Sequence, residues 1–216
     1  MKKITISFFA VIFALSSYCQ DFIGFTSSES TKPACNVLAS EDTIVEFEVL
    51  IPGIHFTMVD SFQRVEIKGH FSMDSVGFPE IPVLSFLVAI PECDNVNISV
   101  ELLDSVKISD INIYPAPAIV EDSTADGSIF LREEFAYSET AYSDNSFFPG
   151  ILAETLAKGA VREQHCVRVF LYPVQFNPVL NEINAYSQMK VTLTFENPSG
   201  TVNENVGIFN EMLGNT

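Results

Sequence analysis

The sequence predicts an all-β protein, an antiparallel β-sandwich of about eight or more strands with one long acidic and aromatic loop. Apolar and polar residues alternate with the period of a half-buried strand, as in segments 96–102 and 191–195. Prolines lie at the ends of such segments, as from Gly77 to Pro117. Helical periodicity is scarce, since only Ile151–Ala157 has room for about two helical turns. These observations together favour stacked sheets.

The expected strands follow one another along most of the chain. Pro52 and Gly53 form a turn after the first strand, and Asp104 with Ser105 is expected to turn the chain between the fifth and the sixth. The expected strands are Thr43–Leu50, Ile54–Val59, Arg64–Lys68, Ile81–Ile90, Val96–Leu103, Val106–Tyr114, Val161–Tyr172 and Glu182–Glu196.

Residues 115–150 interrupt this pattern. They are acidic, rich in serine and aromatic, and contain at most one short strand near Ile129–Leu131. Asp122, Asp126 and Gly127 fit a turn better than a calcium loop, because their spacing does not match the twelve-residue template. Long loops in compact domains often carry function, so this loop is the first place to look for a site.

Composition limits the classes of function. The 216 residues are 47% hydrophobic and 12% aromatic, which suits one domain with a packed core. The formal net charge is −17, and the electrostatic field of such a negative protein repels nucleic acid and anionic lipid. An acidic surface favours a basic partner, or simply keeps an exported protein soluble.

The first residues resemble a secretory signal peptide, which predicts export to the periplasm or the extracellular space. Lys2 and Lys3 precede an apolar segment, Phe8–Leu15, that is too short to span a bilayer. Cleavage is expected between Cys19 and Gln20, and the alternative is a lipid-modified Cys19. Without Lys2 and Lys3 the charge becomes about −19. Residues 20–40 then form a flexible leader.

No residue pattern predicts a catalytic centre, a cofactor or a metal site in this chain. His165 and Cys166 are adjacent, but neighbours on a strand point to opposite faces and cannot act as a base and nucleophile pair. His55 and His70 lack ligand spacing. The remaining cysteines, Cys35, Cys93 and Cys166, allow one disulfide and a spare thiol, with the pairing left open.

Several motifs occur in an order that resembles the N-terminal propeptide of gingipain-type cysteine endopeptidases. They are GFPEIPVLSFLVAIP (77–91), INIYPAP (111–117), FFPG (147–150), GAVREQHCVRVFLYPVQFNP (159–178) and INAYSQMKVTLTFE (183–196). The resemblance covers residues 40 to 197. It implies a signal peptide at 1–19, a β-sandwich propeptide domain at 41–197 and a linker at 198–216 that leads to a caspase-like peptidase domain.

The resemblance also implies a function without catalysis by this chain. Such a prodomain keeps the peptidase latent by blocking its active-site cleft with a loop, and it assists folding and export. Because gingipains cleave after Arg or Lys, Arg132 and Lys158 are the candidate residues of the inhibitory loop. The plainer interpretation of Arg132 is a surface arginine that balances Glu133 and Glu134. A free-standing secreted binding or adhesion module with the same fold is the alternative function.

Overall fold

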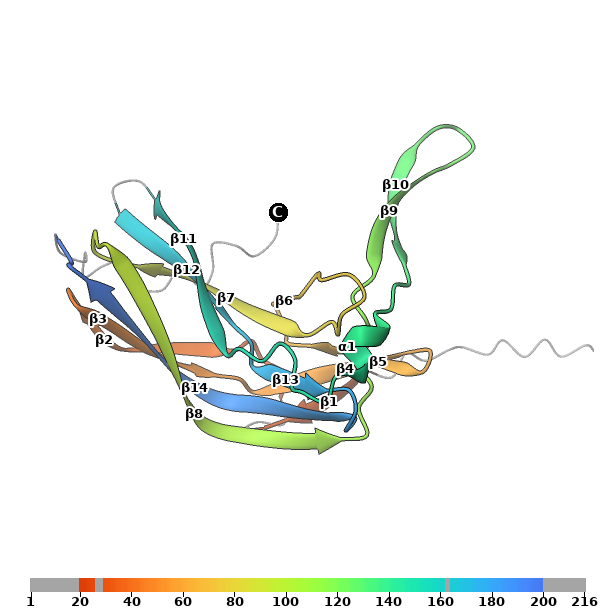
Figure 1. Cartoon of the computed structure of the whole chain (residues 1–216), viewed down its shortest axis with the longest axis horizontal. Coiled ribbons are helices and arrows are strands. Elements are labelled where there is room, and N and C mark those ends of the chain that lie inside the picture. The colour runs from red at the N-terminus through yellow and green to blue at the C-terminus, as the bar shows by residue number, and fades with distance from the viewer. Residues whose placement is uncertain (1–19, 26–28, 162–163, 200–216) are drawn as a thin grey trace, which may run out of the picture.

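Two stacked antiparallel sheets form the body of the protein and confirm the predicted β-sandwich (Figure 1). The computed structural model describes residues 20–25, 29–161 and 164–199. In the five-stranded sheet, β14 pairs with β8 along one edge and with both β13 and β3 along the other, and β2 pairs with β3. Its strands are β2 (Ala34–Glu41), β3 (Ile44–Leu50), β8 (Asn95–Ser109), β13 (Val174–Asn177) and β14 (Glu182–Glu196).

The second sheet has four strands in the order β11-β12-β7-β6. They are β6 (Phe71–Ser72), β7 (Pro82–Ala89), β11 (Ala153–Val161) and β12 (Gln164–Leu171). The two sheets meet through buried side chains on alternate positions. Phe47 on β3 and Phe86 on β7 are both 0% exposed, and their ring centroids lie 5.6 Å apart. This contact lies in the hydrophobic core that the alternating pattern predicts.

A smaller sheet of three strands, β1 (Gln20–Gly24), β4 (Gly53–Val59) and β5 (Phe62–Glu66), adjoins the sandwich. The prediction of a flexible leader at 20–40 is therefore wrong for the described part of that segment, since β1 pairs with β4 and β2 pairs with β3. Gly53 explains the first pairing. A Cβ atom there would lie 2.5 Å from the Phe22 ring, so glycine is what lets Phe22 pack on the backbone of β4.

Asp104 and Ser105 do not form the predicted turn. They lie inside β8, one continuous strand that pairs with β14 over Asn95–Ser109. The register shifts beside this point, and Ser187, which is buried, donates a hydrogen bond of 2.7 Å to the Asp104 carboxylate. The polar pair thus marks a β-bulge in a long strand rather than a strand end.

The predicted long loop contains ordered structure. Strands β9 (Ala118–Ser123) and β10 (Ile129–Glu134) form a hairpin, and the short helix α1 (Glu139–Ser143) follows. The helix begins at Ser138, whose hydroxyl accepts a hydrogen bond from the Ala141 amide. The segment 151–157, the one stretch with room for two helical turns, instead enters strand β11. Its pairing with β12 supplies the hydrogen bonds that a short isolated helix would lack.

The ends of the chain are described only in part. The predicted signal peptide, with Cys19, lies outside the described residues, and the predicted linker is described only to Ser199. The Ser199 amide donates to the Glu92 carbonyl at 2.7 Å, which places the end of the described chain beside the turn before β8. Among the helices of the described ranges, none is long and apolar enough to cross a bilayer.

Candidate functional site

The hairpin formed by β9 and β10, residues 118–134, projects away from the sandwich and is here named the projecting hairpin (Figure 1). Within the described ranges its two strands pair with each other and with no other strand. All six residues of β10 are exposed. The projecting hairpin is therefore the part of the fold most accessible to another molecule.

The tip of the projecting hairpin is an ordered turn. The Gly127 amide donates to the Thr124 carbonyl at 2.9 Å, and Gly127 has a φ of +86° that favours glycine. The Asp126 carboxylate accepts hydrogen bonds from the Thr124 hydroxyl and the Ser128 amide, and these bonds lower the pKa of Asp126. Asp126 is thus used as a turn residue, in agreement with the turn interpretation.

Both faces of the projecting hairpin carry apolar as well as charged side chains. Directly paired residues share a face, so the register places Ile119, Ile129 and Leu131 on one face. These side chains are 60%, 72% and 67% exposed, which is unusual for a row of aliphatic residues. The opposite face carries Phe130 and Arg132. Neither face is covered by the sandwich.

Arg132, the first predicted site residue, lies in the middle of β10 rather than on a loop. Its Nε lies 3.0 Å from the Asp122 carboxylate and its terminal nitrogen 3.6 Å from that of Glu134. Two contacts lower the pKa of Asp122: the hydrogen bond from the Ser123 amide is the larger cause, and the one from Arg132 is the second. Because Arg132 remains 46% exposed, its ion pairs are surface pairs that water and other carboxylates can replace.

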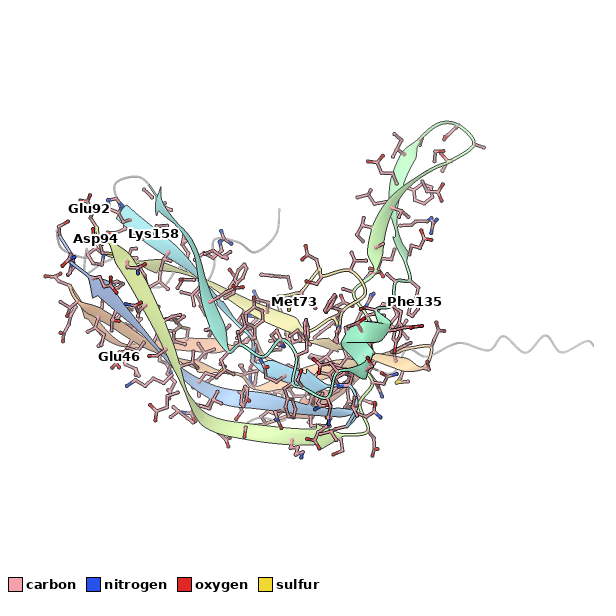
Figure 2. The ribbon with its side chains drawn as sticks, viewed as in Figure 1. Glu46, Met73, Glu92, Asp94, Phe135 and Lys158 are labelled. Atoms are coloured by element: carbon pink, nitrogen blue, oxygen red, sulfur yellow. The ribbon has the colours of Figure 1, made fainter. Side chains whose placement is uncertain are left out.

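Lys158, the second predicted site residue, lies on β11 beside the bulge between Thr155 and Lys158. Its ammonium group donates to the carbonyls of Cys93 and Asp94 at 2.8 and 2.7 Å, as a brace between two parts of the sandwich. Figure 2 shows Lys158 beside Asp94 and Glu92, at the opposite end of the molecule from the projecting hairpin. The structure does not bring the two candidates together, and it gives Lys158 a structural contact instead of a free loop.

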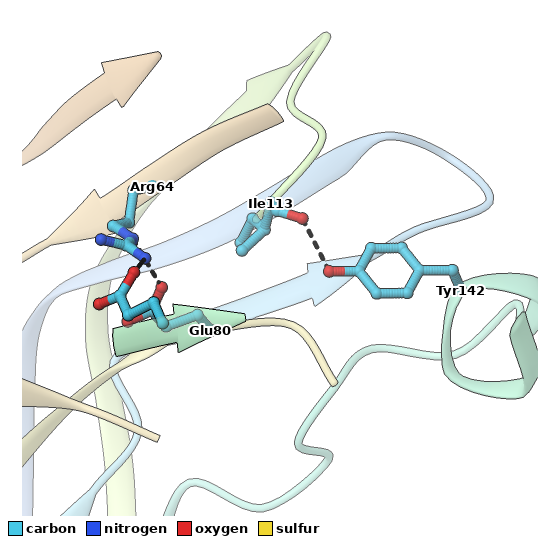
Figure 3. A network of polar contacts seen from close by, with 5 residues as sticks. Arg64, Glu80, Ile113 and Tyr142 are labelled. Atoms are coloured by element: carbon cyan, nitrogen blue, oxygen red, sulfur yellow. Dashed lines mark hydrogen bonds and ion pairs between the residues drawn. The ribbon is translucent and has the colours of Figure 1, made fainter. Parts of the chain in front are cut away.

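The base of the projecting hairpin is held by Arg64, which lies on β5. The guanidinium forms an ion pair of 2.9 Å with Glu80 and a hydrogen bond of 2.7 Å with Glu133 of β10 (Figure 3). It also lies over the Tyr114 ring, 4.7 Å from its centroid. Burial opposes the charge of Arg64, but Glu133 and Glu80 together raise its pKa. Three segments of the chain therefore meet at one cation.

An aromatic cluster surrounds this contact and consists of Phe62, Tyr114, Phe135, Tyr137 and Tyr142. Phe135, the residue after β10, lies 5.9 Å from the rings of both Phe62 and Tyr114, and Figure 2 shows it at the base of the projecting hairpin. The Tyr137 and Tyr142 rings stack at 4.5 Å. The Tyr142 hydroxyl donates to the Ile113 carbonyl at 2.7 Å (Figure 3), and burial raises its pKa.

The three cysteines that allow one disulfide, Cys35, Cys93 and Cys166, are free thiols in this structure. Burial raises the pKa of Cys35 to about 12, so this thiol stays protonated at neutral pH. Cys166 is buried on β12 while its neighbour His165 is exposed. The two neighbours thus differ in exposure, as alternation along a strand predicts.

A second group of polar residues lines a hollow of about 420 Å³ beside β4 and β5. His55 lies 2.6 Å from the Ser30 hydroxyl, and His70 lies on the same rim. Burial is the main cause that lowers the pKa of His70 to about 4, and the charge of Lys32 is the second cause. His70 is therefore neutral at physiological pH. Across the described ranges, no group of three or more His, Cys, Asp or Glu residues is arranged to hold a metal ion.

Sequence reasoning missed Arg64, Glu80 and the ring contacts of Phe62. Arg64 belongs to none of the motifs above, and Glu80 lies in the motif GFPEIPVLSFLVAIP (77–91), which gives no sign of the partners that it meets in the fold. The one available signal was the density of aromatic residues between 135 and 148, which marked the segment without giving its contacts.

Comparison with known proteins places these features in a family. The family model Propeptide_C25 matches residues 27–216. Lys-gingipain HG66 from Porphyromonas gingivalis is 22% identical over 91% of this chain, and Gingipain R2 from the same species is 22% identical over 75%. The chain spans only 12% and 22% of the lengths of these two relatives.

Two solved structures share the fold. The complex of the pro- and mature domains of RgpB from P. gingivalis matches with a TM-score of 0.66 at 20% identity, over 79% of this chain and 90% of that one. A structure concerned with the zymogenic latency of gingipain K from P. gingivalis matches with a TM-score of 0.64 at 19% identity, over 82% of this chain and 99% of that one.

Proposed function

Since the chain belongs to the Propeptide_C25 family, we propose that it is the prodomain of a gingipain-like cysteine endopeptidase precursor and keeps that peptidase latent by occupying its active-site cleft. Its partner is then a peptidase catalytic domain, in the same precursor or on a separate chain. We also propose that the prodomain is exported through a signal peptide at 1–19, which is cleaved before Gln20, and that it assists the folding of the peptidase.

The observation that carries the proposal is the projecting hairpin. It has a hydrogen-bonded turn at its tip, an exposed strand β10 and a fixed contact at its base. It can therefore enter a cleft while the sandwich stays outside. A two-stranded ribbon also offers free main-chain N–H and C=O groups along its outer edges. These groups suit the extended pairing by which proteins bind a peptide strand.

Arg132 is the residue proposed to enter the specificity pocket. It is the only cation in segment 118–134, which also contains five carboxylates, and it sits on an extended strand as a substrate side chain would. Its pairs with Asp122 and Glu134 are exposed to solvent, and such pairs contribute little to stability. Transfer of the guanidinium to a carboxylate in a cleft therefore has a small cost.

An inhibition assay tests this proposal. The mature domains of Gingipain R2 and Lys-gingipain, at about 1 μM, are titrated with the exported chain, and hydrolysis of Arg and Lys substrates is followed. We expect loss of activity of at least one enzyme at about equimolar prodomain. Arg132→Ala should weaken inhibition at least about tenfold, while Lys107→Ala, which removes an exposed cation from β8, should not.

Each other outcome counts against part of the proposal. No inhibition of either enzyme at tenfold excess contradicts latency and favours the alternative, a secreted binding module without a peptidase. Full inhibition by Arg132→Ala excludes Arg132 as the residue in the pocket. Amino-terminal sequencing of the exported protein tests the signal peptide, since any start other than Gln20 contradicts the proposed cleavage.

A further inference from the structure

We infer that Arg64 is a positioning residue, whose guanidinium holds the projecting hairpin in the orientation that presents β10 to a partner. The inference rests on the proposed function for its consequence, since an oriented hairpin matters only if the hairpin binds. The orientation itself is a property of this chain and can be measured without any peptidase.

The projecting hairpin needs a fixed base. An isolated two-stranded hairpin is at best marginally stable in water, and β9 and β10 pair only with each other among the described strands. Both ends of the hairpin join segments that are held by the same part of the body. The chain before β9 is bound through Tyr114, whose amide donates to the Gln63 carbonyl at 2.8 Å. The chain after β10 is bound through Phe135 and Ser138.

Arg64 makes the direct contact between the body and a strand of the hairpin. Its hydrogen bond ends on Glu133, which is opposite Ile119 at the base of the ribbon. The aromatic cluster packs against the segment beyond the strand and is less directional. A guanidinium with planar donors fixes angle as well as distance, because it bonds only along its N–H directions. One residue can therefore set the direction in which the ribbon leaves the sandwich.

Removal of this cation would also introduce repulsion. Glu80 and Glu133 both approach Arg64, at 2.9 and 2.7 Å, so without it two carboxylates face each other across the base. Burial raises the pKa of Glu80 and the charge of Glu133 raises it further, against the attraction of Arg64. Glu66 adds a third negative charge near Glu80. The predicted result is a ribbon that leaves its position while the sandwich stays folded.

Hydrogen exchange of the full chain tests the inference. In Arg64→Gln we expect exchange of the amides of 118–134 to become about tenfold faster, with unchanged exchange in β3 and β14. Glu133→Gln removes the charge of the acceptor in the same contact, from the exposed side, and should have an effect of the same kind. Because the two residues act through one contact, the double variant should be little worse than either single variant. Lys107→Gln, which loses the ion pair with Glu182 elsewhere on the sandwich, is the matched control.

Inhibition assays on the same variants separate this inference from the proposed function. Faster hairpin exchange with weaker inhibition supports both. Faster hairpin exchange with unchanged inhibition supports the role of Arg64 and counts against the hairpin as the inhibitory element. Unchanged hairpin exchange in both Arg64→Gln and Glu133→Gln overturns the inference, whatever the inhibition. Additive effects of the two substitutions overturn it as well, since they would show that the residues act independently.

Discussion

The sandwich and the projecting hairpin are both antiparallel β-structure, yet they differ in what surrounds them. In β14 nearly every second residue is buried, from Ile183 to Phe195, while in β10 all six residues are exposed. Polar and apolar side chains largely alternate along β14, whereas β10 has three apolar residues followed by three charged ones. The sandwich strand uses this alternation to divide core from solvent, and the hairpin strand presents both of its faces to solvent.

A strand can therefore be ordered for two reasons. The sandwich is held by burial of its own apolar side chains, so its order is a property of the whole domain. The projecting hairpin is held by its turn, its own pairing and the contacts at its base. Exposed aliphatic residues such as Ile129 therefore contribute little to stability, and their presence is better explained by a partner.

The largest expected effect concerns the contact between the two sheets. Phe86→Ala should lower the free energy of unfolding by about 3–5 kcal/mol, because it removes a fully buried ring that packs on Phe47. Leu131→Ala on the projecting hairpin should change it by less than about 0.5 kcal/mol. Urea denaturation measures both values. If Leu131→Ala were as costly as Phe86→Ala, the contrast between the two regions would be wrong.

A smaller effect is expected at the bulge of the long strand β8. Ser187→Ala removes the hydrogen bond to Asp104 and should cost about 1 kcal/mol, a moderate value because the Asp104 carboxylate can still reach water. Ser99→Ala, on an exposed position of the same strand, is the control. Equal denaturation midpoints for the two variants would show that the bulge does not depend on this bond.

His70 should make the free energy of unfolding depend on pH. Burial, and then Lys32, lower its pKa to about 4, whereas an unfolded histidine has a pKa of about 6.5. The unfolded state therefore binds the proton first. The stability linked to His70 is present above about pH 6.5 and is lost as the pH falls toward 4.

Thermal unfolding between pH 7 and pH 4 checks this expectation. His70→Asn should show a smaller fall of the melting temperature than the parent protein, and the exposed His165→Asn is the control. Equal slopes for His70→Asn and the parent protein would contradict a half-buried, neutral His70.

The smallest effect is expected at the tip of the projecting hairpin. Asp126→Ala removes the acceptor for Thr124 and Ser128, so exchange of the tip amides should rise while the melting temperature stays the same. Hydrogen exchange and calorimetry measure the two quantities. A lower melting temperature would show that the tip is coupled to the sandwich.

The sequence predicted the parts of the fold in which one face of a strand is buried. The expected strands at 43–50, 81–90 and 182–196 lie close to β3, β7 and β14, because burial of alternate residues leaves a clear pattern. The prediction failed where one local sequence pattern is compatible with two structures. Asp104 and Ser105 have the composition of a turn, but Ser187 from another strand holds them in a bulge.

The candidate site was predictable only in part, for a related reason. The unusual segment 115–150 could be identified, since composition is a local property, whereas Arg132 was named only through the resemblance to gingipain propeptides. The base of the projecting hairpin could not, because Arg64, Glu80 and Glu133 meet only through the folded chain. The strand at β1 was missed because Phe22 packs on Gly53, a contact with no local signal.

The proposed binding by the projecting hairpin can be examined by hydrogen-exchange mapping of this chain, alone and with an equimolar mature domain of a gingipain that it is found to inhibit. We expect protection on binding to be concentrated in residues 118–134 and to include the amides beside Arg132, with smaller changes in the sandwich strands. Protection confined to a sandwich face, with unchanged exchange in the projecting hairpin, would contradict it.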